Sequence, residues 1–288
     1  MSGAGAVTRQ QSRMRSFFAE LPLAGKIGFA LVVFWLAVAV LGPLLAPYPV
    51  GAFVTNDVFE DASIHHWLGS DYLGRDVLSR LLLGARYTIG LALGGAVLAV
   101  VTGTALALFA TVNRGWTDEA LSRFMDTLIS IPSRIFALVL VAAFGSSLLL
   151  LLLIAAIIYM PGNYRIARSL AVNLNEMDYV QVARARGEGS VYVAAIEILP
   201  NMLNPLLADF ALRFMFIVLL LASLSFLGLG VQPPDADLGS LVRENVSGLP
   251  DGALAILAPS VAIATITVGV NLLIDALPGR TRSVPAER

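Results

Sequence analysis

The chain alternates between long apolar stretches without a charged residue and shorter segments that carry most of the charge. An uncharged apolar run of about 18 residues or more is typical of a helix that crosses a membrane. The run from 135 to 164 is longer than one span needs, and Gly145, Ser146 and Ser147 predict a turn in its middle. We therefore predict six membrane-spanning helices, at about 27–45, 87–112, 128–144, 147–160, 205–227 and 253–274.

Composition supports an all-α membrane protein and excludes other classes. Of the 288 residues, 57% are hydrophobic and 14% are charged, and the mean hydropathy is +0.80, whereas soluble domains carry about 25% charged residues. The absence of cysteine excludes disulfides and thiolate chemistry, and a net charge of −1 gives no indication of nucleic acid as a partner. His65 and His66 have no third ligand nearby, so we predict no metal site and expect both on a loop surface.

The distribution of arginine and lysine predicts the orientation of the spans. Positively charged residues collect on the cytoplasmic side of a membrane protein. Six spans with both termini in the cytoplasm place most of the 19 basic residues on that side, whereas five spans reverse the bias. The resulting segments are a cytoplasmic arm (1–26), a six-span transmembrane domain (27–275), external loops at 47–86 and 230–252, a cytoplasmic loop at 162–202, and a cytoplasmic tail (276–288).

The cytoplasmic loop is long enough to form structure of its own. Its composition predicts short helices at 164–174 and 178–186, a break at the glycine-containing segment 187–190, and a third helix at 191–199 that ends before Pro200. Two interpretations remain open from this spacing. The loop is either a hairpin on the membrane surface or an element that docks on a partner.

This loop resembles the coupling loop of bacterial ABC importer permeases. The segment 178–201 carries Gly187 and the pair Leu199 and Pro200 at the spacing of that family's signature. The resemblance implies that the loop contacts an ATPase subunit. The residues that it assigns to this contact are Tyr179, Gln181, Val182, Ala183, Arg184, Ala185, Arg186, Gly187, Glu188, Gly189, Leu199 and Pro200.

Two further segments are similar to one branch of the same family. Residues 66–76 resemble the segment before span two in the second, C-type permease of dipeptide, oligopeptide and nickel transporters, and residues 226–234 resemble the end of its span five. We expect the acidic and basic residues of the first segment to form an external ion-pair cluster. The matching residues of that segment are His66, Gly69, Asp71, Gly74, Arg75 and Asp76.

The resemblance implies the fold and the partners of a type I ABC importer. This chain would form half of a translocation pathway for peptides or a similar small solute in the bacterial cytoplasmic (inner) membrane. Its partners would be a second homologous permease, membrane lipid, two cytoplasmic ATPase subunits and an external solute-binding protein. The chain would bind no cofactor and catalyse no reaction, because ATP and Mg²⁺ belong to the partner ATPases.

A few residues within the predicted spans are candidates for the pathway. Asp209 and Arg213 lie four positions apart at the start of span five, where they either serve function or extend to the membrane interface. Arg134, early in span three, is expected near the cytoplasmic surface. Gly95 and Gly103 belong to a row of small residues on span two, which favours close helix packing over contact with solute.

Two other classes of function compete with an importer permease. An ion-gradient-driven secondary transporter is the alternative, but the sequence shows no internal repeat and no paired broken helices of the kind that hold ions. An intramembrane enzyme has no support, because the chain lacks an HExxH motif, cysteine and paired acids within its spans.

Overall fold

The computed structural model describes residues 22–276, and its regular elements over that range are helices. The predicted arm before residue 22 and the tail after residue 276 lie outside the described residues. The elements are α2 (Leu23–Leu45), α3 (Val77–Asn113), α4 (Trp116–Ser130), α5 (Ser133–Phe144), α6 (Leu148–Asn175), α7 (Asp178–Ala185), α8 (Ser190–Tyr192), a π-helical turn (Val193–Ile198), α9 (Leu199–Phe226), α10 (Leu238–Glu244), a 3₁₀ turn (Val246–Gly248) and α11 (Leu254–Ala276).

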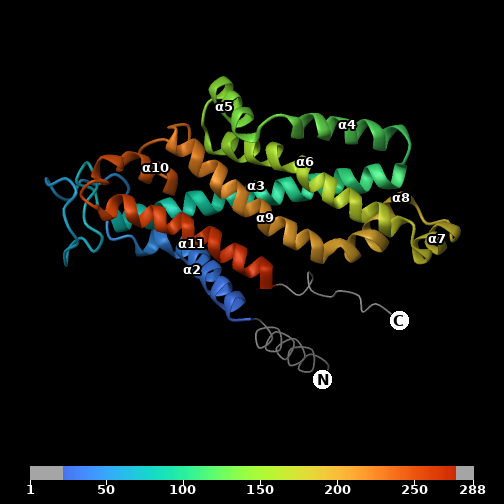
Figure 1. Ribbon diagram of the computed structural model, residues 1–288, viewed down its shortest axis with the longest axis horizontal. Helices are drawn as coiled ribbons and strands as arrows, with labels where there is room; N and C mark the ends of the chain where they lie inside the picture. The colour runs from blue at the N-terminus through green and yellow to red at the C-terminus, as the bar shows by residue number, and fades with distance from the viewer. Residues whose placement is uncertain (1–21, 277–288) are drawn as a thin grey trace.

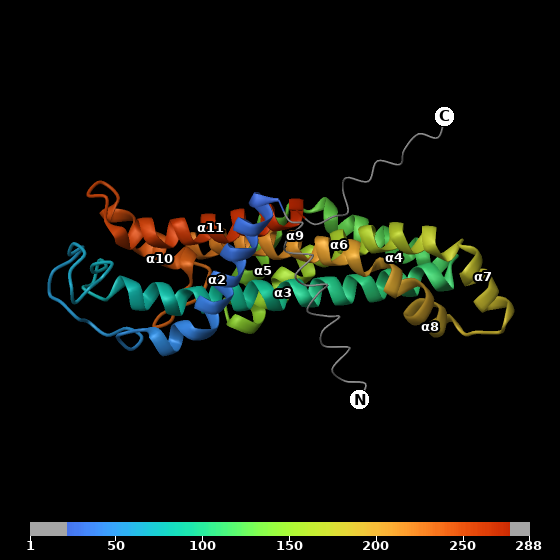
Figure 2. The ribbon, with the colours of Figure 1, turned by 90° about the horizontal axis from the view of Figure 1, so that it is seen from below.

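Three long helices, α3, α6 and α9, pack against one another along the long axis of the molecule (Figure 1). The short helices α7 and α8 lie at one end of this axis (Figures 1 and 2). The non-helical segment between α2 and α3 lies with α10 at the other end. Helix α2 crosses the bundle obliquely and packs against α11 and α3. The two ends therefore carry different structures, and the spans connect them.

The buried apolar side chains form two clusters, one in the middle of the bundle and one near α7. The first joins α2, α3, α5, α6, α9, α10 and α11, and the second joins α3, α4, α6, α7 and α9. Outside these clusters the spans expose large apolar side chains, as a lipid-facing surface does because acyl chains solvate them. Exposed examples are Val40, Leu44, Phe109, Phe144 and Val261.

Five described helices are long and apolar enough to cross a membrane, and α4 with α5 adds a sixth crossing if this bent pair is one span. The predicted span at 128–144 is wrong as a straight helix, because α4 and α5 meet at 87°. Pro132 lies between them, and the residue before a proline avoids the helical conformation. Ile131 is accordingly extended, with φ −83° and ψ 124°.

The helix of the fourth span is longer than predicted. The expected separate helices at 147–160 and 164–174 are one continuous helix, α6, which contains Pro161. Beyond its apolar stretch, Arg168 donates to Asp118 of α4 through Nε at 2.5 Å, so the charged turns pack on a neighbouring helix. The charged residues after the apolar stretch therefore show where α6 leaves apolar surroundings. They do not show where the helix ends.

Two other helix ends differ from the predictions, each for its own reason. Helix α3 begins at Val77, well before the predicted start of the span at residue 87, because Asp76 caps it and Arg80 in its first turns is buried in a polar cluster. The predicted stop before Pro200 is also wrong, since Pro200 lies in the first turn of α9. The chain is helical from Ser190 to Phe226, and the π-helical turn Val193–Ile198 directly before Pro200 gives the wider local spacing that accommodates a proline.

Helices α3 and α6 approach closely at Gly103. A methyl group added to Gly103 would lie 2.6 Å from Oδ1 of Asn163 and 2.8 Å from the carbonyl oxygen of Met160. Gly95 also lies where α3 meets α6, and a methyl group added there would lie 3.2 Å from Cβ of Ala155. The row of small residues on α3 therefore lies at helix contacts.

Alanine at Gly103 should loosen this crossing, whereas alanine at Gly90 of the same helix should not. The Gly103→Ala methyl meets backbone and a buried amide, an overpacking that costs about 1–3 kcal/mol. The Gly90→Ala methyl meets nothing within 4 Å and should stabilise the helix by up to about 1 kcal/mol. Melting temperatures of the two variants in the same detergent would measure the difference, and equal melting temperatures would contradict the close crossing.

Candidate functional site

The first candidate site is the segment between α6 and α9, which contains the predicted coupling residues. Helix α7 buries one face, where Val180 and Ala183 have no exposed area, in the apolar cluster that joins α3, α4, α6 and α9. Asp178 lies in the first turn of α7, where a negative charge favours the helix dipole. The segment is therefore attached to the spans through a packed core.

Hydrogen bonds to the end of α6 add to this attachment. Nη2 of Arg184 donates to the side-chain oxygen of Asn175 at 2.9 Å, and Nε2 of Gln181 donates to the Asn175 carbonyl at 3.0 Å. Asn175 is buried. On the α9 side, Arg186 lies 3.9 Å from Glu197. Helix α7 therefore cannot rotate independently of α6 without breaking buried contacts.

Gly187 ends α7 in a Schellman motif. Its N–H donates to the Arg184 carbonyl at 2.9 Å, and the N–H of Glu188 donates to the Ala183 carbonyl at 3.2 Å. Gly187 has φ +83°, a left-handed conformation that side chains disfavour. Gly189 has an ordinary φ of −75°. The predicted break at 187–190 thus has a specific backbone geometry.

The opposite face of the segment is exposed. Val182 is 56% exposed, Tyr179 is 39% exposed, and Pro200 is exposed in the first turn of α9. Leu199 packs on the buried cluster instead. The other exposed residues of the predicted set are Gln181, Ala185, Arg186, Gly187 and Gly189. An exposed face with apolar and cationic residues can bind another protein.

The second candidate site is a buried polar cluster between α3, α6 and α9. Oδ1 of Asp209 accepts from Arg213 Nη2 at 2.9 Å, while Oδ2 accepts from Nδ2 of Asn163 at 2.8 Å. The hydroxyl of Thr104 lies 3.1 Å from Oδ1 of Asn163. Asp209 lies in the interior of α9, which begins before the predicted span, and it is 3% exposed.

Sequence reasoning missed Asn163 and Thr104 in this cluster. Neither is charged, and uncharged polar residues are common in membrane helices, so no local signal marked them. Only the packing of α3 on α6 brings Thr104 to Asn163.

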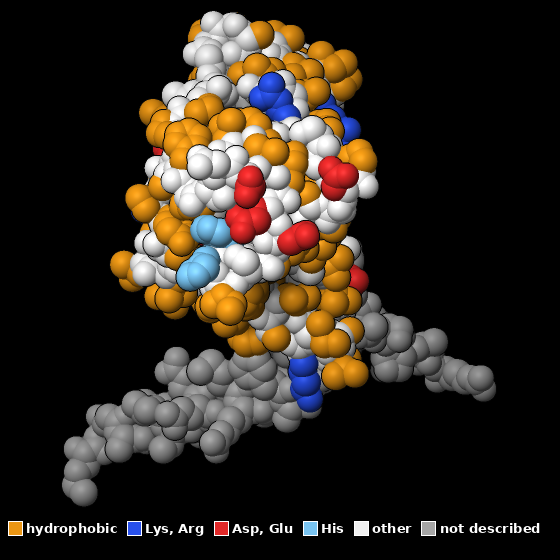
Figure 3. Space-filling model, turned by 90° about the vertical axis from the view of Figure 1, so that its left-hand side faces the viewer, with side chains coloured by type: hydrophobic (Ala, Val, Ile, Leu, Met, Phe, Trp, Pro, Cys, Tyr) orange, Lys and Arg blue, Asp and Glu red, His pale blue; other side chains and the backbone are white. Residues whose placement is uncertain are grey.

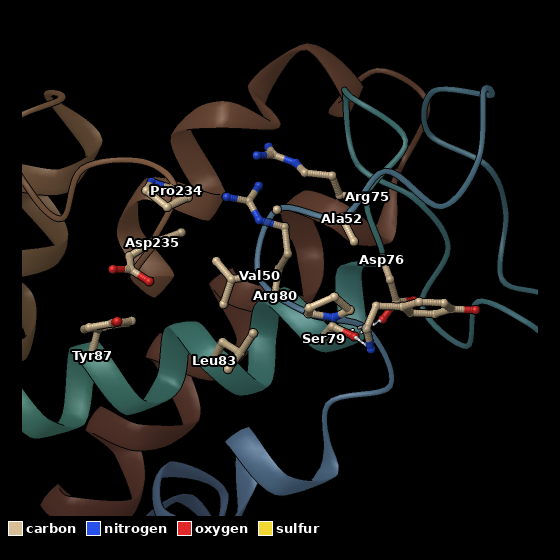
Figure 4. A pocket seen from close by; sticks show the side chains of 14 residues that line it. Val50, Ala52, Arg75, Asp76, Ser79, Arg80, Leu83, Tyr87, Pro234 and Asp235 are labelled. Atoms are coloured by element: carbon tan, nitrogen blue, oxygen red, sulfur yellow. Dashed lines mark hydrogen bonds between the residues drawn. The ribbon is translucent and has the colours of Figure 1, made fainter.

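The third candidate site is the ion-pair cluster at the end opposite α7. Asp71 accepts from Nε of Arg75 at 2.7 Å and from Nη1 of Arg80 at 2.8 Å. Both arginines also bind Oε2 of Glu244 in α10, at 2.8 and 2.7 Å. Figure 4 shows the side chains of Arg75 and Arg80, which extend from neighbouring positions toward the same region. Asp76 caps α3 by accepting from the Ser79 N–H at 2.7 Å.

These contacts join the segment between α2 and α3 to α10. Burial disfavours the charge of Arg75, but Asp71 and Glu244 together raise its pKa above the ordinary value. Arg80 could not have been found from helical spacing, because its partner Asp71 precedes α3. Glu244 could not be found either, because it is distant in sequence.

His66, Gly69 and Gly74 also belong to this end of the molecule. The prediction that His66 lies on the surface was wrong: it is 7% exposed, and its Nδ1 lies 3.6 Å from Oδ1 of Asp76. Gly69 and Gly74 form tight turns in the same segment. Among the described residues no group of His, Cys, Asp and Glu is arranged to hold a metal ion.

The N-cap residue of α10, Asp237, is a further buried carboxylate. Asp237 caps α10 by accepting from the Ser240 N–H at 2.7 Å, and it also accepts from the hydroxyl of Ser225. Burial raises the pKa of Asp237 above its usual value, and the hydrogen bonds from Ser225 and Ser240 only partly oppose this. Asp237 thereby ties α10 to the end of α9.

A cavity of about 510 Å³ lies beside the buried polar cluster. It is bounded by the α4–α5 break, α6 and α9. Arg134 lies at the second position of α5, just after the break. It is therefore separated from the α3–α4 turn by all of α4, and its expected place early in a straight span was wrong.

Comparison with known proteins identifies the family. Residues 99–283 match the model of the family described as binding-protein-dependent transport system inner membrane component. The chain belongs to this family. A glutathione transport system permease protein of Pectobacterium atrosepticum is 32% identical over 247 residues, which cover 85% of this chain and 82% of the relative.

Two other relatives cover more of the chain. A dipeptide transport system permease protein of Alkalihalophilus pseudofirmus is 30% identical over 251 residues, which cover 87% of this chain and 83% of the relative. A putative peptide transport system permease protein of Brucella suis is 33% identical over 269 residues, which cover 93% and 88%. These matches confirm the resemblance that the motifs indicated, and the fold is that of a type I ABC importer transmembrane domain.

In this permease-family chain, removing the Asp71 charge should destabilise the end that carries α10. Asp71→Asn leaves two buried arginines with Glu244 as their remaining carboxylate, and breaking a buried pair costs about 3–5 kcal/mol. Glu119→Gln is the matched control, because its pair with Arg123 is exposed. Limited proteolysis between α2 and α3 would report the loosening. Equal cleavage in the two variants would contradict a structural role for the cluster.

Proposed function

We propose that the chain is a permease subunit of an ATP-driven importer and forms half of its translocation pathway. The proposed solute is a peptide, or a similar small solute, because the relatives are named as dipeptide, peptide and glutathione transport permeases. The proposed partners are a second homologous permease, two cytoplasmic ATPases that bind ATP and Mg²⁺, and an external solute-binding protein. The proposed location is the bacterial cytoplasmic membrane.

The observation that carries this proposal is the two-sided arrangement of α7. One face is packed in the cluster that contains α3, α4, α6 and α9, and the other is exposed. A movement of a protein bound to the exposed face would therefore shift the spans as rigid bodies, rather than bend a loop. Rigid-body movement of packed elements is a common means of switching between two states.

This role assigns the α7 end to the cytoplasm and the α10 end to the outside. Figure 3 views the α10 end, where acidic side chains gather among apolar ones. Exposed residues of this end include Asp57, Asp61, Asp251, Ile64 and Trp67. An acidic and apolar surface of this kind suits a binding protein that delivers solute.

Purification of the complete complex tests the proposal. The tagged chain would be extracted from its native membrane in mild detergent, and every co-purifying chain would be identified by mass spectrometry. We expect a second six-span permease and one or two kinds of ATPase, with the binding protein added when ATP is trapped. Recovery of this chain alone under both conditions would contradict an importer and favour transport driven by an ion gradient.

Coupling between ATP hydrolysis and transport should depend on the left-handed backbone conformation of Gly187. Gly187→Leu forces a side chain into φ +83°, which costs about 1–2 kcal/mol, and displaces the exposed end of α7. Gly189→Leu is the control, because Gly189 has an ordinary φ and neither added Cβ meets an atom within 4 Å. We expect the first variant alone to lose stimulation of ATP hydrolysis by loaded binding protein, at normal membrane levels.

The reconstituted complex would show this loss as a drop of about tenfold or more in solute-stimulated phosphate release. Full stimulation in Gly187→Leu would show that the segment does not couple to an ATPase. A loss of similar size in both variants would show that the conformation of Gly187 is not the reason.

A further inference from the structure

The lining of the cavity beside the α4–α5 break contains positively charged side chains and no negatively charged ones. Thirteen residues line the cavity, and they include two arginines and no acidic residue, although Arg165 is paired with Asp126, outside the lining, at 3.7 Å. Its volume of about 510 Å³ lies within the range of small-molecule sites, about 300–1,000 Å³. The lining residues on which the argument rests are Pro132, Ser133, Tyr159, Gly162, Arg165 and Arg213.

Arg213 brings its charge to this cavity from a buried position. Its side chain is 14% exposed, and Nε and Nη2 donate to Asp209. Asp209 lies behind it and is not among the cavity residues. The third nitrogen, Nη1, packs over Gly162, where an added methyl group would lie 2.5 Å away. The guanidinium is thus held in place by α6 and α9 and lies at the cavity wall.

The rest of the wall suits an amphipathic solute. Tyr159 stacks on Phe216 with ring centroids 6.2 Å apart, and it is close enough to Arg213 and Arg134 to interact electrostatically with both. Guanidinium groups have the planar geometry that binds carboxylates through two donors. Apolar side chains complete the wall, as they do in sites that enclose small molecules.

We propose that this cavity is the region of the translocation pathway that binds the carboxylate of the solute, and that Arg213 supplies the binding charge. The inference rests on the proposed function, because it adds a solute-contacting residue to the same pathway. Asp209, Asn163 and Thr104 act as positioning residues. They hold Arg213 without closing the cavity.

A single cysteine can measure the charge of the cavity, because the chain has no cysteine of its own. Ser133→Cys places a thiol in the lining, and Ser247→Cys places one on the exposed turn after α10 as the control. The complete complex would be reconstituted in phosphatidylcholine nanodiscs, so that no anionic lipid competes. Mass shifts of this chain would report the rates of labelling by methanethiosulfonates that differ in charge, ethylsulfonate and ethyltrimethylammonium.

We expect the ratio of anionic to cationic labelling at Ser133→Cys to fall on the order of tenfold in Arg213→Gln, whereas the ratio at Ser247→Cys should not change. Removal of one unit charge from the cavity wall has an effect of this order in an effective dielectric constant of about 20. The ratio at Ser133→Cys should also fall in the double variant Asp209→Asn with Arg213→Gln, which leaves no buried unpaired carboxylate. It should persist in Arg213→Lys. No labelling in any nucleotide state, or a preference that survives loss of Arg213, would overturn the proposal.

Protection by solute links the charge to transport. Dialanine with its binding protein should slow labelling at Ser133→Cys, and dialanine amide, which lacks the carboxylate, should not. If uptake assays show dialanine transport, equal protection by both would overturn the proposal. If the complex transports no dialanine, its solute is another peptide or small molecule, and the charge preference still decides whether the cavity attracts anions.

Discussion

The rest of the structure depends on the close crossing of α3 and α6 at Gly103. Within a bilayer, backbone groups must pair inside their own helices, so the spans associate through side-chain packing and buried polar contacts. The absence of a side chain at Gly103 lets Asn163 reach Thr104 on one side and Asp209 on the other. One small residue therefore sets the distance at which three spans share a polar cluster.

Different interactions stabilise the two ends of the bundle. At the α7 end, apolar packing joins the exposed segment to the spans, and Asn175 adds hydrogen bonds to it. At the α10 end, a non-helical segment is held by ion pairs between Asp71, two arginines and Glu244. Packed apolar contacts transmit displacement, whereas a buried ion cluster keeps irregular backbone in one arrangement. Each end is thus suited to a different partner.

Because of the α4–α5 break, the spans do not form a simple bundle of straight helices. A bend of 87° at Pro132 changes the direction of the chain between α4 and α5 and leaves the cavity that Arg213 faces. An arginine inside a membrane domain is costly unless it is paired or faces water or solute. Asp209 provides the pair, and the cavity provides room for a second anion. Pro132 and Arg213 therefore line the same cavity, although they come from different parts of the chain.

The sequence by itself determined which segments are apolar enough to span a membrane, the break at Gly187, and the family of the chain. Those features depend on composition and backbone preference within short stretches of residues. It did not determine where α3, α6 and α9 begin or end, because charged turns such as those at Arg80 and Arg168 remain helical when a neighbouring element pairs with them. Only the tertiary structure decided the partners of Asp209 and Arg80, since Asn163 and Glu244 are distant in sequence and approach through helix packing.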